Sequence, residues 1–155
     1  MLSITTIATG KCKDKSTLAL EAEYAKRLNA FARYSVTELH QSKAQTAELI
    51  KKQEAEKQLL AIPNDAFVIA LDEKGEHLKT AALAQKLAHE QNTGNSHFCF
   101  IIGGAEGLAP SVTERANLTL SLSKLTFPHM LVRVLLAEQL YRALSLNAGH
   151  PYHRE

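Results

Sequence analysis

Short apolar runs alternate with helical patterns along the whole chain of 155 residues. The apolar runs are rich in Ile, Leu, Phe and Thr and predict strands at residues 2–8, 35–40, 67–71, 98–102 and 118–122. The helical patterns place apolar side chains three or four residues apart and predict helices at 16–33, 42–60, 80–91, 110–115 and 128–146. This alternation predicts one α/β domain over residues 1–155, with a largely parallel sheet.

Local signals mark where several helices should begin and end. Ser42 with Gln45, and Ser111 with Glu114, have the spacing of capping boxes. The helix at 128–146 is apolar around more of its circumference than a helix with one solvent-facing side should be. We therefore expect part of that helix to pack against a second copy of the chain in a two-fold dimer.

Composition narrows the class of protein. Apolar residues make up 45% and charged residues 22% of the chain, which is ordinary for a globular protein. The two cysteines lie far apart, which excludes a disulfide scaffold and a four-thiolate zinc site; no metal site is expected. The N-terminus does not resemble a signal peptide and no segment is long enough to span a bilayer. The sequence therefore predicts a cytoplasmic protein.

Charge alone does not indicate a partner. The formal net charge is +2, with basic ends and an acidic middle. Lys11, Lys13 and Lys15 alternate within five residues, as in a segment that contacts phosphates. A solvated turn before a helix explains the same pattern, and on charge alone that interpretation is favoured.

Three strand ends are candidates for a binding site, because ligands of open α/β sheets bind at the carboxyl ends of strands. They are Leu71-Asp72, the glycine-containing loop 103–107 and the run 122–129. Glycines let the backbone approach a ligand closely, although a tight strand-to-helix connection needs them too. A phosphate-binding P-loop is excluded because Leu108-Ala109 stands where Lys-Ser/Thr is required. A Rossmann site is excluded because the glycines follow the fourth predicted strand, not the first.

Polar side chains near the end of the chain are a second candidate. Glu138 and Arg142 are four residues apart on a mostly apolar helix, so we expect them to pair. Such a pair is usually structural. Tyr152, His153 and Arg154 follow the end of that helix, and side chains of these types stack on bases and hold phosphates. A frayed, solvated tail is the alternative.

Several long motifs resemble those of the ribosomal RNA large-subunit methyltransferase H family. They are Ile101-Ile102-Gly103-Gly104-Ala105-Glu106-Gly107-Leu108, the run 120–129 with its continuation through Arg133, Glu138-Gln139 and Tyr141-Arg142-Ala143, and the closing Pro151-Tyr152-His153-Arg154-Glu155. The N-terminal half is similar through Gly10-Lys11, Tyr24 and Arg27-Leu28. The resemblance covers the whole chain, and no motif position departs from it.

That resemblance implies a SPOUT-type α/β fold with a trefoil knot near the C-terminus, and a homodimer. It implies S-adenosylmethionine as methyl donor and N3 of a pseudouridine in large-subunit (23S) ribosomal RNA as the target, with no DNA or membrane partner. The cofactor contacts that it implies are Leu71, Gly103, Leu122, Ser123, Lys124, Leu125, Thr126 and Phe127. These lie at the three strand ends identified above.

Methylation at N3 requires removal of a proton and accurate placement of the nitrogen. His129 and His153 are candidate proton acceptors, because histidine titrates near neutral pH. Glu138 is a poorer candidate if it pairs with Arg142. Arg142 and Tyr152 are expected to position the base. Two alternatives stay open: a SPOUT methyltransferase that acts on another RNA nucleotide, and a non-catalytic module that binds RNA or ribosomes.

Overall fold

A computed structural model describes residues 1–154 of the chain. Five strands form one sheet in the order β2-β1-β4-β3-β5, and all neighbouring strands are parallel. The strands are β1 (Ser3–Thr9), β2 (Arg33–Leu39), β3 (Phe67–His77), β4 (His97–Ile102) and β5 (Leu118–Ser121). The helices are α1 (Lys15–Leu28), α2 (Ala47–Ala61), α3 (Thr80–Asn92), α4 (Pro110–Arg115) and α5 (His129–Asn147). The predicted parallel α/β sheet is confirmed.

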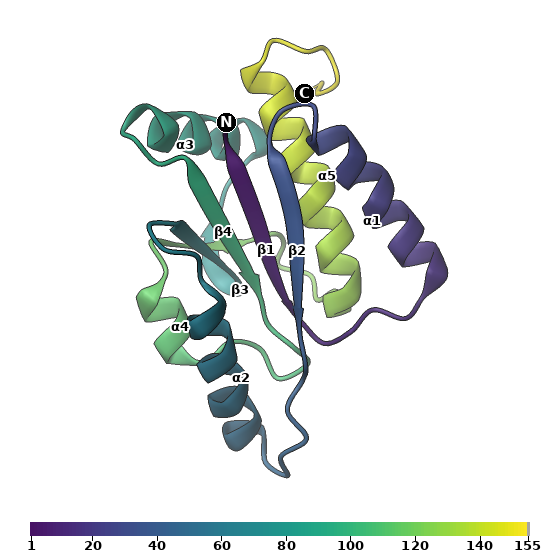
Figure 1. Cartoon of the computed structure of the whole chain (residues 1–155), viewed down its shortest axis with the longest axis vertical. Coiled ribbons are helices and arrows are strands. Elements are labelled where there is room, and N and C mark those ends of the chain that lie inside the picture. Colours follow the sequence, from purple (N-terminus) through teal and green to yellow (C-terminus); the bar gives the residue numbers. More distant parts are fainter. Residues whose placement is uncertain (155) are drawn as a thin grey trace.

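Helices cover both faces of the sheet, which makes three layers (Figure 1). α1, α3 and α5 lie on one face, and α2 with α4 on the other. The central strand β4 shows why both faces must be covered, since Phe98 and Phe100 pack into one core while Cys99 and Ile101 pack into the other. A strand that is apolar at every position cannot leave either face in water. No helix among residues 1–154 has both the length and the apolar character needed to cross a membrane.

The boundaries of α1 differ from the prediction. The helix begins after Asp14, whose carboxylate accepts a hydrogen bond from the Thr17 N–H at 2.9 Å. It ends at Leu28 because the next residues form tight turns, and Arg33 then donates its N–H to the Leu2 carbonyl at 2.8 Å as the sheet begins. The apolar spacing that extended the predicted helix to residue 33 continues into a strand.

Both predicted capping boxes are wrong. Thr46 caps α2 by accepting from the Leu49 N–H at 3.2 Å. The Ser42 hydroxyl instead donates to the Gln53 Oε1 atom at 2.5 Å, which ties the preceding loop to the helix. Helix α4 has the predicted bounds but begins without a side-chain cap. The proline at its first position favours a helix start there.

Strand β3 is longer than predicted and has an insertion in its pairing with β5. Leu71 and Glu76 both lie opposite Leu120, so the four residues between them bulge out of the ladder. Gly75 in this bulge approaches β5 so closely that a Cβ there would lie 2.6 Å from the Thr119 carbonyl oxygen. The sequence predicts that Asp72 to Gly75 end the strand, because a bulge and a turn have similar compositions. The trefoil knot stays a prediction.

Candidate functional site

The carboxyl ends of β3, β4 and β5 surround a cavity of about 690 Å³. Of the eight predicted cofactor contacts, seven line it: Leu71, Gly103, Leu122, Ser123, Leu125, Thr126 and Phe127. The eighth, Lys124, is exposed and does not line the cavity. His129, a candidate proton acceptor, lines the cavity as well. The three strand ends chosen from the sequence therefore come together at one place.

The glycine loop at the end of β4 is compact and closes on itself. The Gly107 N–H donates to the Gly104 carbonyl at 3.0 Å. Gly107 has a φ of +82°, a backbone conformation that residues with a side chain rarely adopt. At Gly103 a Cβ would lie 2.9 Å from the Gly107 carbonyl carbon. A side chain at Gly103 would therefore displace the loop itself.

The segment after β5 folds over the cavity as a second wall. The Ser121 hydroxyl donates to the Ser123 carbonyl at 3.0 Å, and the Ser123 hydroxyl accepts from the Leu125 N–H at 2.9 Å. These bonds hold the segment in a turn that leaves the Leu125 side chain 71% exposed. An apolar side chain so exposed beside a cavity is available to cover a bound ligand.

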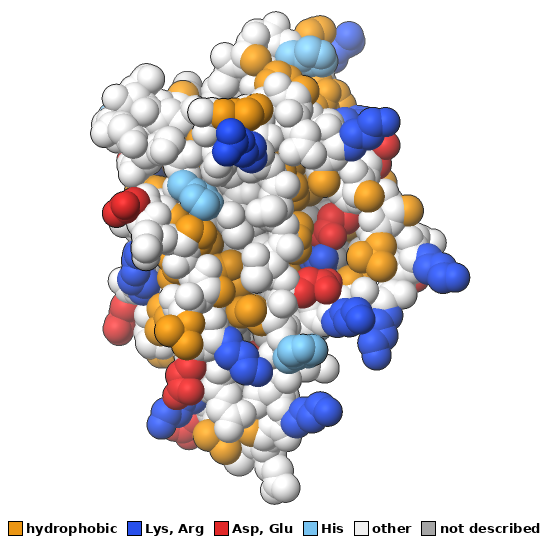
Figure 2. All heavy atoms as spheres, in the orientation of Figure 1, with side chains coloured by type: hydrophobic (Ala, Val, Ile, Leu, Met, Phe, Trp, Pro, Cys, Tyr) orange, Lys and Arg blue, Asp and Glu red, His pale blue; other side chains and the backbone are white. Residues whose placement is uncertain are grey.

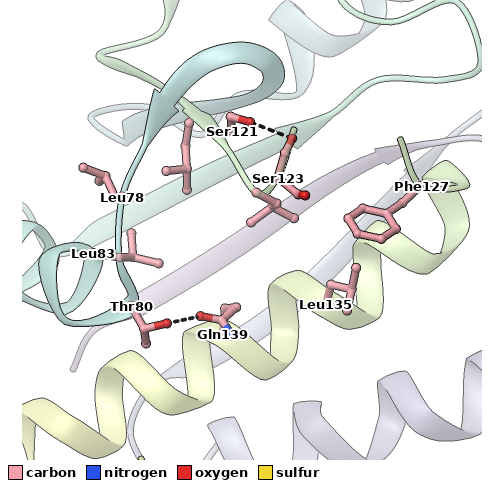
Figure 3. A pocket seen from close by; sticks show the side chains of 10 residues that line it. Leu78, Thr80, Leu83, Ser121, Ser123, Phe127, Leu135 and Gln139 are labelled. Carbon is pink, nitrogen blue, oxygen red and sulfur yellow. Dashed lines mark hydrogen bonds between the residues drawn. The ribbon is translucent and has the colours of Figure 1, made fainter. Parts of the chain in front are cut away.

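A smaller cavity of about 310 Å³ lies on the α5 side of the same segment. Leu122, Ser123 and Phe127 line both cavities, so they form the partition between the two. Figure 3 shows Leu135 and Gln139 of α5 facing this space, with Thr80 opposite. The Thr80 hydroxyl donates to the Gln139 Oε1 atom at 2.7 Å, which fixes the start of α3 against α5.

A buried ion network stands behind the first turns of α5. Arg133 is 3% exposed and makes two hydrogen bonds of 2.8 Å to Glu21 of α1 and one of 2.5 Å to Glu38 of β2. Burial disfavours the charged form of Arg133, but the hydrogen bonds that it donates to both carboxylates raise its pKa above the ordinary value. The network therefore stays charged and fixes α5 against α1 and β2.

The other candidate catalytic residues lie together at the C-terminal end of α5. Arg142 pairs with Glu138, with Nε 2.9 Å from Oε2. The Arg142 guanidinium lies 5.0 Å from the centre of the Tyr152 ring, and its Nη1 atom is 3.4 Å from His153 Nδ1. Tyr141 stacks edge-on against Tyr152 with ring centres 4.6 Å apart. The tail of rings and charges is therefore packed onto the helix.

This tail cluster also contains α1 residues whose place in it the sequence did not reveal. Arg27 lies 5.2 Å from the centre of the Tyr24 ring and 5.7 Å from that of Tyr141. The hydrogen bond that Arg142 donates to Glu138 raises the pKa of Arg142, while burial and then the Glu138 charge raise the pKa of Tyr152. At neutral pH the cluster thus offers two guanidinium cations and a neutral phenol.

The structure does not bring all five candidate catalytic residues together. Glu138, Arg142, Tyr152 and His153 form the tail cluster, whereas His129 lies at the cavity. Arg142 lies 13 positions after His129 on the same helix, or about 20 Å along its axis. Within one chain, the tail cluster and the cavity are separate.

The surface charges do not single out either place. Figure 2 shows positive and negative side chains interspersed over the face that it draws, which includes parts of both helix layers, as expected from a net charge of +2. A mixed field of this kind does not attract one sign of ligand strongly.

The chain matches known proteins over nearly all its length. A family model described as a predicted SPOUT methyltransferase matches residues 2–153. A protein of Desulfotalea psychrophila named ribosomal RNA large subunit methyltransferase H is 43% identical over 94% of this chain and 95% of its own. One of the same name from Bifidobacterium adolescentis is 42% identical over 99% of this chain and 100% of its own.

The chain belongs to the ribosomal RNA large subunit methyltransferase H family of SPOUT methyltransferases. A solved structure of a probable methylase family protein from Haemophilus influenzae has a similar fold. It superposes with a TM-score of 0.54 at 12% identity, over 99% of this chain and 70% of that one. At that identity the likeness concerns the fold alone, and it agrees with the parallel sheet described above.

The larger cavity fits the S-adenosylmethionine that SPOUT methyltransferases of this family use. Its volume of about 690 Å³ lies in the range typical of small-molecule sites. Leu71, Leu122 and Phe127 give it apolar walls that suit a purine ring. The glycine loop lines the cavity with backbone groups, which a ligand can approach closely.

Proposed function

We propose that this chain transfers a methyl group from S-adenosylmethionine to large-subunit (23S) ribosomal RNA, at N3 of a pseudouridine. The observation that carries the proposal is the cavity at the strand ends, lined by seven of the eight residues that family resemblance assigns to the cofactor. Relatives named for methylation of large-subunit ribosomal RNA match the chain over its whole length. Such a protein acts in the cytoplasm, where bacterial ribosomes are.

Residues around the cavity would hold the cofactor. Leu71, Leu122 and Phe127 would enclose its purine, and the backbone of the glycine loop would contact its polar edges. When bound, the cofactor supplies an activated methyl group. The remaining work, namely placing the target nitrogen and removing its proton, belongs to side chains of the protein.

The tail cluster is suited to positioning the base. Arg142 faces His153 Nδ1, so that atom accepts from the guanidinium and the neutral imidazole carries its proton on Nε2. His153 and Arg142 then act as donors to the carbonyl oxygens of a uracil-type ring, and they stabilise the negative charge that develops as N3 loses its proton. In this arrangement both ring nitrogens of His153 are engaged, Nδ1 as an acceptor from Arg142 and Nε2 as a donor, so neither is free to take the N3 proton.

His129 is the better proton acceptor of the two histidines. His129 is half-buried beside the cavity. Within residues 1–154, neither of its ring nitrogens makes a hydrogen bond to an arginine. General base catalysis of this kind contributes roughly 10²–10⁴-fold, and positioning contributes more. The proposed division of labour therefore needs His129 and the tail cluster at the same base.

A two-fold dimer would bring them together. Because about 20 Å of helix separates them in one chain, the tail cluster of one copy would serve the cavity of the other. The solvent-facing side of α5 has an apolar stripe that suits such a contact, with Leu131 39% and Leu146 37% exposed. Leu135 lies between them at the mouth of the smaller cavity.

The proposal is tested by titrating the protein with S-adenosylmethionine and then assaying methyl transfer to ribosomes that lack the modification. Mapping the methylated position separates N3 of a pseudouridine from any other nucleotide. Cofactor binding without transfer to any RNA would support a non-catalytic module instead. A monomer by light scattering at micromolar concentration would contradict the shared site.

A further inference from the structure

Glu54 is a buried carboxylate directly behind the glycine loop. It lies on α2 and is 3% exposed. Its Oε2 atom accepts a hydrogen bond from the Ser42 N–H at 2.9 Å. Its Oε1 atom is also buried, yet it has no hydrogen-bond partner within the described residues. A buried charged oxygen without a partner is costly, so its retention calls for an explanation.

The unpartnered oxygen faces the loop that lines the larger cavity. A Cβ at Gly104 would lie 3.1 Å from Glu54 Oε1 and 3.3 Å from Thr9 Cγ2. The missing side chain at Gly104 is what lets the carboxylate approach the loop backbone. Lys51, one turn earlier on α2, lines the cavity itself. This side of α2 is therefore the outer wall of the candidate cofactor site.

The loop has donors to offer. Ala105 and Glu106 are exposed at its tip. Across the part of the chain that the structure covers, neither of their N–H groups donates to a backbone carbonyl. An ionised carboxylate only accepts hydrogen bonds, and bonds between a carboxylate and a backbone N–H are among the stronger ones. Glu54 Oε1, an acceptor without a donor, thus lies behind a loop in which the N–H groups of Ala105 and Glu106 are available to donate.

We propose that Glu54 is a positioning residue for the cofactor. When S-adenosylmethionine fills the cavity, the glycine loop settles onto α2 and the N–H of Ala105 or Glu106 donates to Glu54 Oε1. The bond from Ser42 keeps the carboxylate aimed at the loop meanwhile. This inference rests on the proposed cofactor site. It assigns to Glu54 a role in binding that a purely structural buried residue would not have.

Replacing Glu54 by glutamine tests the role with almost no change of shape. The Ser42 N–H holds the amide oxygen at the Oε2 position, so the amide NH₂ takes the Oε1 position and presents donors to the loop N–H groups. Glu56→Gln is the matched control, because it removes the same charge from an exposed position of the same helix. Calorimetry should give about tenfold weaker S-adenosylmethionine binding for Glu54→Gln and an unchanged affinity for Glu56→Gln.

Two further measurements separate positioning from folding. Without cofactor, the melting temperature of Glu54→Gln should equal or exceed that of the wild type, because a buried charge is gone. Hydrogen exchange at Ala105 and Glu106 should slow when the wild type is saturated with S-adenosylmethionine, and should stay fast in saturated Glu54→Gln. Gly104→Ala, which puts a methyl group between Oε1 and the loop, should lose affinity to a similar extent, even if Glu54→Gln does not fold.

Wild-type affinity and amide protection in Glu54→Gln, or unchanged affinity in Gly104→Ala, would overturn the inference while leaving the proposed function intact. A wild-type protein that does not bind S-adenosylmethionine would overturn both. The two failures are therefore distinguishable.

Discussion

The two ends of α5 are built for different tasks. At its first turns, His129 and Val132 line a cavity, and Arg133 behind them is held by two carboxylates in a buried network. At its last turns, Arg142 contacts the Tyr152 ring and His153, and all three side chains are partly exposed. At the first end the charge of Arg133 is paired inside the protein, whereas at the second end the hydrogen-bond donors of Arg142 remain at the surface.

The difference teaches how one helix can serve two roles. Buried charges that pair fully with each other fix an element in place and leave nothing for a ligand. Charges stacked on rings at the surface remain available to bases and phosphates. We therefore expect changes in the buried Arg133 network at the first end to affect stability, and changes in the tail cluster at the second end to affect catalysis.

The largest effect should come from removing the tail. A protein truncated after Pro151 loses Tyr152 and His153 but little apolar core. Methyl transfer should fall by roughly 10²-fold or more, because positioning of the base is lost. The free energy of unfolding should change by about 1 kcal/mol or less, and S-adenosylmethionine affinity should not change. Near-normal methylation of ribosomes by this protein would show that the tail is dispensable.

Mixed dimers test directly whether the two ends of α5 meet across a subunit boundary. Gly103→Val should disable the cavity, and Arg142→Ala should disable the tail cluster, so each protein alone should be nearly inactive. If a site takes its cavity from one copy and its tail from the other, refolding an equal mixture should restore about a quarter of the wild-type sites. An inactive mixture of confirmed heterodimers would show that each chain uses its own tail.

The buried network should dominate stability at the first end. Arg133→Met would leave Glu21 and Glu38 without their partner, and breaking a buried pair in this way costs about 3–5 kcal/mol. Urea unfolding measures the loss. Lys86→Met is the control, since it breaks the more exposed pair with Glu90 and should cost under about 1 kcal/mol. Equal losses in the two variants would refute the structural role of Arg133.

The smallest expected effect is a pH dependence from Glu38. Burial would raise the pKa of this carboxyl, but hydrogen bonds from Arg133 and the Cys12 N–H lower it below its ordinary value of 4.5. As the pH falls, Glu38 is therefore protonated at a higher pH in the unfolded chain than in the folded one. The stabilisation that its charged form provides is complete above the unfolded pKa and is lost as the pH falls through the folded pKa. With the Glu38 side chain 33% exposed, its share should stay under about 1 kcal/mol.

Urea midpoints measured between neutral pH and pH 3 would reveal this dependence. Glu38→Gln removes the titrating group and should flatten the acid side of the stability curve. An unchanged curve in that variant would mean that other carboxylates account for the acid sensitivity.

The local pattern of apolar and polar residues was sufficient to predict most helices and strands. The prediction failed where contacts with distant parts of the chain decide the structure. Helix α4 has the predicted bounds, since a proline opens it and its apolar side is clear. Strand β3 was cut short because Gly75 and its polar neighbours have the composition of a turn, although they pair with β5. The Ser42 capping box failed because that hydroxyl binds Gln53 across the loop.

The candidate site could be located from the sequence for a physical reason. The carboxyl ends of parallel strands lie on one edge of a sheet, so Leu71, Gly103 and Phe127 had to come near one another once the strands were identified. Side chains that reach the cavity from helices carried no such signal. Lys51 lines it from α2, although nothing in its local sequence sets it apart from the neighbouring lysine.

The amino-acid sequence by itself determined the α/β class, the strand ends that form the cavity and the pairing of Glu138 with Arg142, because each depends on periodicity or spacing within one element. Only the tertiary structure decided that Glu21 and Arg133, 112 residues apart, share a buried network. It alone placed Glu54 behind Gly104 and separated His129 from the tail cluster. Such contacts depend on the order of strands and the packing of helices, which local periodicity does not encode.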